Sequence, residues 1–159
     1  MASISLVSVC VLITLTLVTL FLITMKKFSD KERGSDIFYV TRGTKTVDSP
    51  FYNIGNSCGF FIDGESGKTL YLHRGRSYKF VIKAESKAIM CESSLPESFY
   101  FTLSPVGGPN DNTDQMIDLP GLAVSEGILI VTITETLPTV FYYQSKNSLN
   151  YGGMIIIVD

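Results

Sequence analysis

The stretch "GFFIDGESGKTLYLHRGRSYKFVIK", residues 59–83, decides the fold class of this chain of 159 residues. Short runs of β-branched and aromatic residues are separated by turn signals at Asp63-Gly64, Gly67 and Arg74-Gly75. From Tyr78 to Ile82 an apolar side chain of large size stands at every second position, which is typical of a strand with one buried face. The stretch therefore predicts several β-strands joined by tight turns.

The same pattern continues on both sides of this stretch. Runs of strand-forming residues are "DIFYVT", "SFYFTLS", "GILIVTITE", "TVFYYQ" and "MIIIVD", and a long polar loop, "PVGGPNDNTDQMIDLPG", interrupts them. No helical period occurs after residue 36. Seven or eight short strands in roughly 120 residues predict an all-β, antiparallel sandwich or barrel over residues 37–159.

The N-terminal part of the chain has a different character. Residues 4–25, "ISLVSVCVLITLTLVTLFLITM", contain no charged side chain. A helix of this length spans about 30 Å, which is the thickness of the hydrocarbon core of a bilayer. A cleaved signal peptide is the competing interpretation, but no basic residue precedes the run and "MKKFSDKER" follows it instead of a small-residue cleavage site. We expect a transmembrane helix in residues 1–26 and a juxtamembrane linker in residues 27–36.

Charges next to the apolar run predict its orientation. Lys26, Lys27, Lys31 and Arg33 follow the run, where they would contact lipid headgroups, and no charge precedes it. The positive-inside rule then places the β domain on the cytosolic side of the membrane. Of three cysteines, Cys10 lies in the run, so the set does not form a disulfide framework, although a Cys58–Cys91 bond stays open.

The remaining composition excludes several classes of function. Residues 37–159 carry nine basic and twelve acidic side chains, a net charge of −3, which is no footprint for nucleic acid. The "DGESGK" turn lacks the spacing of a phosphate-binding loop. The "GGPNDNTD" segment has oxygen ligands but lacks the closing glutamate of a calcium loop, so we interpret it as an exposed loop.

Three motifs in order resemble a cupredoxin-like domain found in marine microbial, phage and large-DNA-virus proteins. They are "FYNIGNSCGFFIDGESGKTLYLHRGRSYKF" from residue 51, "ESFYFTLSPVGG" from residue 97, and the tail "YYQSKNSLNYGGMIIIVD". The resemblance covers about residues 37–159 and implies a cupredoxin-like Greek-key β-sandwich or barrel. A shared fold does not imply a shared function.

The resemblance also locates the positions of a type-1 copper site, which uses two His, a Cys and an axial Met. In this chain the two His positions hold Glu97 and Ser148, the Cys position holds Ser145, and the Met position holds Tyr151. His73 is the one histidine of the sequence and lies far from this loop in motif order. We expect these vestigial positions to cluster without metal, cofactor or catalytic role.

The resemblance extends to membrane-anchored proteins of large algal DNA viruses and implies a setting. We expect a structural, non-catalytic minor capsid protein that links an internal virion membrane to the capsid shell. Its partners would be the bilayer and capsid proteins, with no nucleic acid or small-molecule substrate. The alternatives are a cellular single-pass protein whose domain binds a soluble partner, and a copper electron-transfer protein. A metal site shared between two copies through Cys58 or Cys91 and His73 also stays open.

Overall fold

The computed structural model describes residues 14–21, 36–86, 91, 97–116, 119 and 123–159. Two compact units make up the chain, residues 1–35 and residues 36–159. In the first unit residues 14–21 are helical, and the basic flank from Lys26 to Arg33 and most of the expected linker lie outside the described residues. None of the helices in the described part of the chain has the length and apolar character needed to cross a bilayer.

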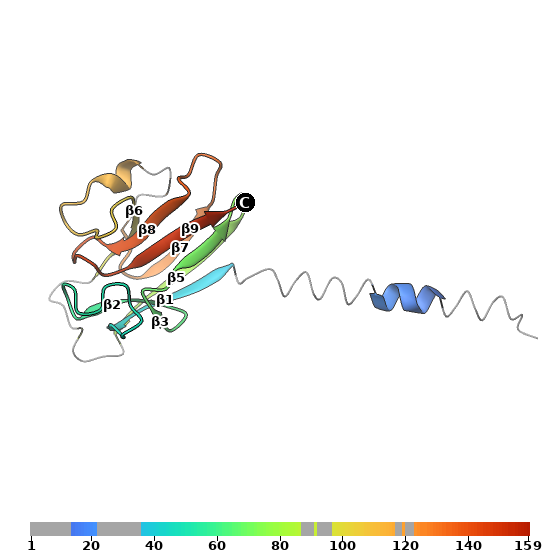
Figure 1. Cartoon of the computed structure of the whole chain (residues 1–159), viewed down its shortest axis with the longest axis horizontal. Helices are drawn as coiled ribbons and strands as arrows, with labels where there is room; N and C mark the ends of the chain where they lie inside the picture. The colour runs from blue at the N-terminus through green and yellow to red at the C-terminus, as the bar shows by residue number, and fades with distance from the viewer. Residues whose placement is uncertain (1–13, 22–35, 87–90, 92–96, 117–118, 120–122) are drawn as a thin grey trace, which may run out of the picture. The chain divides into compact units, whose positions relative to one another are not determined.

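The second unit is mostly β and has two sheets (Figure 1). The first sheet has the strand order β3-β2-β1-β5-β7, and the second has the order β4-β9-β8-β6. The strands are β1 (Ile37–Thr44), β2 (Cys58–Ile62), β3 (Glu65–Ser66), β4 (Leu70–His73), β5 (Ser77–Ser86), β6 (Phe99–Thr102), β7 (Gly127–Thr132), β8 (Val140–Ser145) and β9 (Gly153–Val158). A short 3-10 helix, η2 (Thr113–Met116), lies in the long loop after β6.

The expectation of a purely antiparallel structure is wrong. β1 pairs with β5 in parallel, and β4 pairs with β9 in parallel, while the other strand pairs are antiparallel. Parallel neighbours need a long crossover connection, which β2 to β4 supply between β1 and β5. Local alternation of side chains is the same in both kinds of pairing, so the sequence pattern does not distinguish them.

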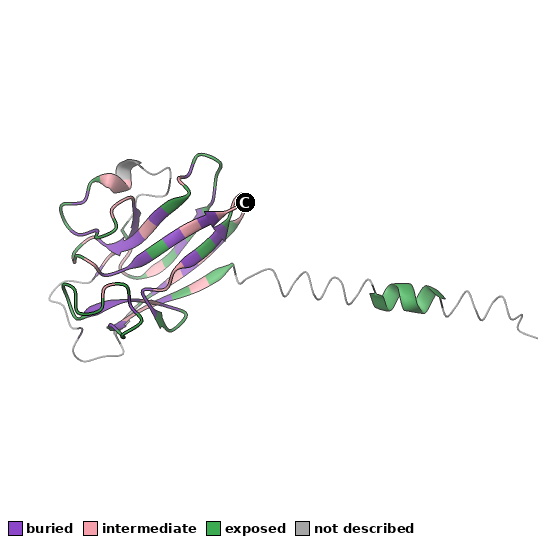
Figure 2. Cartoon of the chain, viewed as in Figure 1, coloured by how far each residue is buried: buried purple, intermediate pink, exposed green. Residues whose placement is uncertain are grey.

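Aromatic and aliphatic side chains from both sheets form the core. The buried residues are purple in Figure 2. In β5 the alternating residues Tyr78, Phe80 and Ile82 are buried, as the pattern predicted. All four residues of β6 are buried. The ring of Phe99 lies at the centre and contacts the rings of Phe60, Phe80, Phe101 and Tyr143. Edge and offset contacts of this kind add to the free energy gained from burial.

The turn at Asp63-Gly64 joins β2 to β3. Both residues have positive φ, 52° and 87°, which is what a two-residue hairpin turn of the primed type requires. Asp63 tolerates this conformation because its side chain accepts a hydrogen bond from the Tyr39 backbone N–H at 2.9 Å. Asp63 and Gly64 therefore form the tight turn that the sequence predicted.

A disulfide joins Cys58, at the start of β2, to Cys91, beyond the end of β5. Both cysteines are buried. The bond closes a loop with a sequence separation of 33 residues. The sequence left this Cys58–Cys91 bond open, and the structure contains it. The bond connects β2 of the first sheet to Cys91, which precedes β6 in the chain.

Removing this disulfide should destabilise the β domain. For a loop of this length the entropy lost by the unfolded chain corresponds to about 3.7 kcal/mol. We expect Cys58→Ala with Cys91→Ala to lower the free energy of unfolding by that amount, measured by guanidinium unfolding of the full chain in detergent. Cys10→Ser, which leaves the bond intact, is the control. A loss below about 1 kcal/mol would show that the bond contributes little.

Candidate functional site

The four positions identified from the sequence lie at one end of the second sheet. Glu97 precedes β6, Ser145 is the last residue of β8, and Ser148 and Tyr151 belong to the loop between β8 and β9. β6 and β8 run antiparallel with Phe99 opposite Ser145. The start of one strand therefore lies beside the end of the other.

The carboxylate of Glu97 is the centre of this arrangement, and we call Glu97, Ser145 and Ser148 the Glu97 cluster. The Ser145 hydroxyl donates a hydrogen bond to Oε2 of Glu97, and the Ser148 hydroxyl donates to Oε1 at 2.6 Å. Ser145 Oγ also accepts from the backbone N–H of Asn147 at 3.0 Å and of Ser148 at 3.3 Å. One buried carboxylate thus holds the end of β8 and the following loop together.

Tyr151 closes the site on the core side. Its ring packs edge-on against Phe60, with the ring centroids 4.9 Å apart, and it is buried. Burial, followed by the negative charge of Glu97, raises the pKa of the Tyr151 phenol to about 12, while the positive charge of Arg42 opposes this. Tyr151 is therefore a neutral phenol at physiological pH and offers no anionic ligand.

Gln144 is a supporting residue that the sequence reasoning missed. Its buried side chain accepts hydrogen bonds from the backbone N–H groups of Tyr151 at 3.0 Å and Gly152 at 2.8 Å. It also donates to the carbonyl of Pro105 at 2.6 Å. A glutamine at a buried strand end is a weak signal in sequence, because its role depends on two distant loops that only the fold brings to it.

The Glu97 cluster does not fit a copper ion. Both carboxylate oxygens of Glu97 already accept serine hydroxyls, and the soft thiolate and imidazole donors that copper prefers are replaced. His73 is exposed at the end of β4. Within the described part of the chain, no group of three or more His, Cys, Asp or Glu side chains could hold a metal ion.

The same geometry argues against nucleophilic catalysis. A serine nucleophile needs a base that takes its proton and a path for the substrate to its oxygen. Ser145 and Glu97 are 0% and 1% exposed, so a substrate has no access to this hydroxyl. The cluster is suited to hold a loop in one shape.

Glu97→Gln should destabilise the domain by about 1–3 kcal/mol, because the amide offers one oxygen where two serine hydroxyls need acceptors. Glu65→Gln is the matched control, since Glu65 is exposed on β3 and its ion pair with Lys68 is on the surface. The measurement is urea unfolding of both variants at neutral pH. Equal stability of the two variants would contradict the role given to the cluster.

A second polar cluster centres on Asp111, in the segment whose composition resembled a calcium loop. The Asp111 carboxylate accepts hydrogen bonds from Tyr100 at 2.6 Å, from Thr102, and from Thr113 at 2.8 Å. The Lys146 ammonium donates to the Asp111 carbonyl at 2.6 Å and lies 4.8 Å from the centre of the Tyr100 ring. Because these groups occupy the carboxylate oxygens of Asp111, the segment is a loop held in place by its own hydrogen bonds.

The Asp111 cluster should make the stability of the domain depend on acid pH. Burial by itself would raise the pKa of the Asp111 carboxyl, but hydrogen bonds from Thr102, Tyr100 and Thr113 outweigh it and lower the pKa to about 2. A lowered pKa in the folded state means stability that is full above the unfolded pKa of about 3.9 and is lost as pH falls toward 2.

We expect about 2 kcal/mol of the free energy of unfolding to disappear between pH 4 and pH 2 through this residue. In Asp111→Asn this part of the pH dependence should be absent. Asp48→Asn, at an exposed loop position, should keep it. Urea unfolding at closely spaced pH values measures the difference, and identical profiles for wild type and Asp111→Asn would contradict the assignment.

No protein-family model matches the chain, and no curated protein has a significant sequence match. Among solved structures, the chain is similar to reduced rusticyanin, with a TM-score of 0.44, 15% identity, and coverage of 79% of this chain and 81% of that chain. For rusticyanin from Thiobacillus ferrooxidans the TM-score is 0.43, the identity 16%, and the coverage 79% of each chain.

A variant of the McoA multicopper oxidase from the hyperthermophile Aquifex aeolicus is similar with a TM-score of 0.41 and 18% identity. The likeness covers 77% of this chain and 26% of the oxidase. At these scores the likenesses carry no argument about function or metal content. The two-sheet β architecture stands on the strand pairing of this chain itself.

Proposed function

We propose that this chain is a structural, non-catalytic minor capsid protein. In this proposal the apolar run of residues 4–25 is anchored in an internal virion membrane, and a cupredoxin-like β domain links that membrane to the capsid shell. The domain binds other structural proteins and carries no cofactor.

The observation that supports a non-catalytic role is the Glu97 cluster. Hydrogen bonds among its own side chains use the oxygens that a ligand or substrate would need. Because this site is closed, we propose that the two-sheet domain acts through its outer surface, to which a partner protein binds. The virion setting rests on the sequence resemblance, and the anchor rests on the apolar run and the basic residues after it.

The Cys58–Cys91 disulfide bears on the choice between settings. Disulfides persist in secreted proteins and on virion surfaces, and are rare in proteins that remain in the cytosol. A cellular protein whose β domain stays on the cytosolic side would keep these cysteines reduced. The disulfide therefore favours a domain that leaves the reducing cytosol, as inside a released particle, over a domain that stays on the cytosolic side of a cellular membrane.

Crosslinking mass spectrometry on purified virions tests this proposal. We expect crosslinks from lysines of the β domain to capsid proteins, and co-purification of the chain with the internal membrane after gentle disruption of the shell. Release of the chain by detergent without any crosslink to a capsid protein would refute it. Stoichiometric copper in the purified chain would instead support the electron-transfer alternative.

A further inference from the structure

The outer face of the first sheet carries two registered rows of side chains. In one row Ile37 pairs with Lys79, which pairs with Ile130. In the next row Tyr39 pairs with Val81, which pairs with Ile128. Adjacent residues of β5, such as Tyr78 and Phe80, point into the core, so all six members of these rows point outward. We call these six residues the outer-face patch.

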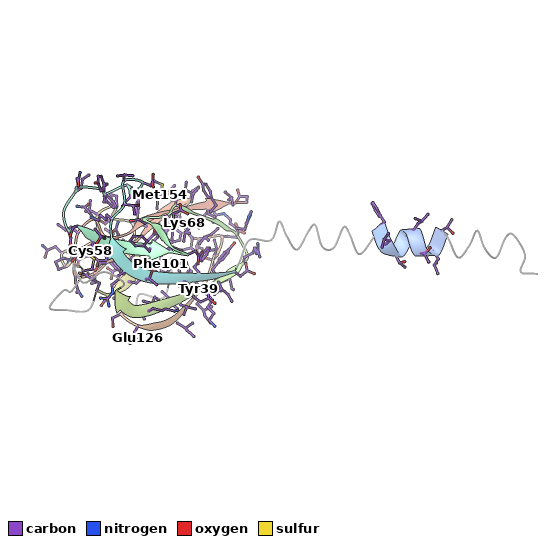
Figure 3. The ribbon with its side chains drawn as sticks, turned by 90° about the horizontal axis from the view of Figure 1, so that it is seen from below. Tyr39, Cys58, Lys68, Phe101, Glu126 and Met154 are labelled. Atoms are coloured by element: carbon purple, nitrogen blue, oxygen red, sulfur yellow. A yellow bond between two sulfur atoms is a disulfide. The ribbon has the colours of Figure 1, made fainter. Side chains whose placement is uncertain are left out.

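Four of the six residues, Ile37, Tyr39, Ile128 and Ile130, are apolar or aromatic and exposed, while Lys79 and Val81 are half-buried. The exposed fractions are 61% for Ile130, 57% for Ile128 and 50% for Tyr39. Figure 3 labels Tyr39 on β1. Large apolar side chains that are contiguous and exposed to this degree mark a surface that another body covers.

The charges around the patch are positive at its centre. Lys79 lies within the first row, and the Lys83 ammonium lies 5.8 Å from the centre of the Tyr39 ring. Neither lysine forms a salt bridge with another described residue. Three acidic residues lie near the patch: Asp63 accepts a hydrogen bond from the Tyr39 backbone N–H at 2.9 Å, Asp36 pairs with Arg76 at 2.6 Å, and Glu126 precedes β7.

This combination has the chemistry of a membrane interface. Aliphatic side chains enter the boundary between headgroups and acyl chains, tyrosine lies at the headgroup level, and lysine is attracted to anionic phosphates. The exposed row on the other sheet, formed by Tyr71, Ile156 and Val140, contains no lysine. The first sheet is therefore the better match to an anionic lipid surface.

The order of the chain brings this face to a bilayer. Ile37, the first residue of β1, belongs to the patch, and the expected linker of residues 27–36 separates it from the expected helix of residues 1–26. Ten residues reach no more than roughly 35 Å when fully extended. A surface tethered at that distance experiences a millimolar effective concentration of its target, so a weak contact is enough to hold it.

We propose that the outer-face patch lies on the anionic lipid surface of the membrane in which the same chain is anchored. This inference rests on the anchor in the proposed function. The domain would then lie flat against the bilayer through its first sheet. The second sheet, with the exposed residues Tyr71 and Met154 on its outer side, would face the protein partner; Figure 3 labels Met154.

Fluorescence quenching on the full chain tests the proposal. In a Cys10→Ser background, a bimane label is attached to Ile130→Cys or, as the matched control on the other sheet, to Tyr71→Cys. The chain is reconstituted into phosphatidylcholine vesicles with or without phosphatidylserine, and the quencher is a lipid with a nitroxide headgroup. We expect strong quenching at position 130 that increases with phosphatidylserine, and weak quenching at position 71.

Lys79→Ala with Lys83→Ala should weaken the contact about fivefold for each lysine, because a basic residue near an anionic surface contributes ~1 kcal/mol. Equal quenching at positions 130 and 71 in both lipids would overturn the proposal. Shielding of position 130 in detergent without vesicles would also overturn it, since a second copy or another protein would then cover the patch.

Alkaline carbonate extraction of the same vesicles separates this proposal from the anchor on which it rests. A chain that is extracted refutes the anchor. A chain that stays in the membrane and is quenched equally at positions 130 and 71 refutes only the contact of the patch with lipid.

Discussion

A variant with Glu97→His, Ser145→Cys, Ser148→His and Tyr151→Met should bind a copper ion through donors that the natural side chains at these positions do not supply. Glu97 contacts both serines directly, and its charge acts on the Tyr151 phenol, so the four side chains converge on one volume. Two imidazoles, a thiolate and a weak thioether are the donors of a type-1 copper site. Supplying them to this backbone should give tight copper binding at these four positions.

Elemental analysis and visible absorption measure this outcome. We expect stoichiometric copper and an intense thiolate-to-copper band in the fourfold variant. The matched control keeps Ser145 and carries the other three substitutions, and it should lack the band because it has no thiolate. A folded fourfold variant without copper would show that these positions do not form the ligand set that the resemblance implies.

Gly152→Ala should be the most destabilising single substitution among those considered for this protein. A Cβ atom on Gly152 would lie 1.7 Å from the backbone carbonyl oxygen of Tyr143, which cannot move without breaking the pairing of β8 with β9. We expect a loss of at least about 4 kcal/mol in the free energy of unfolding, since the clash is with main chain in a packed sheet.

Gly64→Ala is the control for this prediction. Nothing lies within 4 Å of the Cβ position at Gly64, but its φ is +87°, so the substitution tests backbone strain without crowding. The cost there should be about 1–2 kcal/mol. If Gly152→Ala and Gly64→Ala unfold at the same denaturant concentration, the close approach of the Tyr143 carbonyl is not the reason for a glycine at position 152. If the difference is as expected, the close approach of the Tyr143 main chain explains why position 152 holds a glycine.

The Glu97 cluster shows how far sequence reasoning reached at the candidate site. The resemblance located Glu97, Ser145, Ser148 and Tyr151, because motif order and spacing place them at strand ends that a β-sandwich brings together. The hydrogen bonds of Gln144 to the next loop were not predicted, because they join Pro105, Tyr151 and Gly152 across loops with no shared local pattern.

The sequence by itself determined the local structure of the β domain. Alternation in β5 and the turn at Asp63-Gly64 follow from side-chain periodicity and backbone preference, which act over a few residues. Only the tertiary structure decided that β1 pairs in parallel with β5, that Cys58 bonds to Cys91, and that Ile37, Lys79 and Ile130 form one row. The physical reason is that strand pairing, a disulfide and a surface row depend on the distance between residues that are far apart in the chain, and local patterns carry no information about that distance.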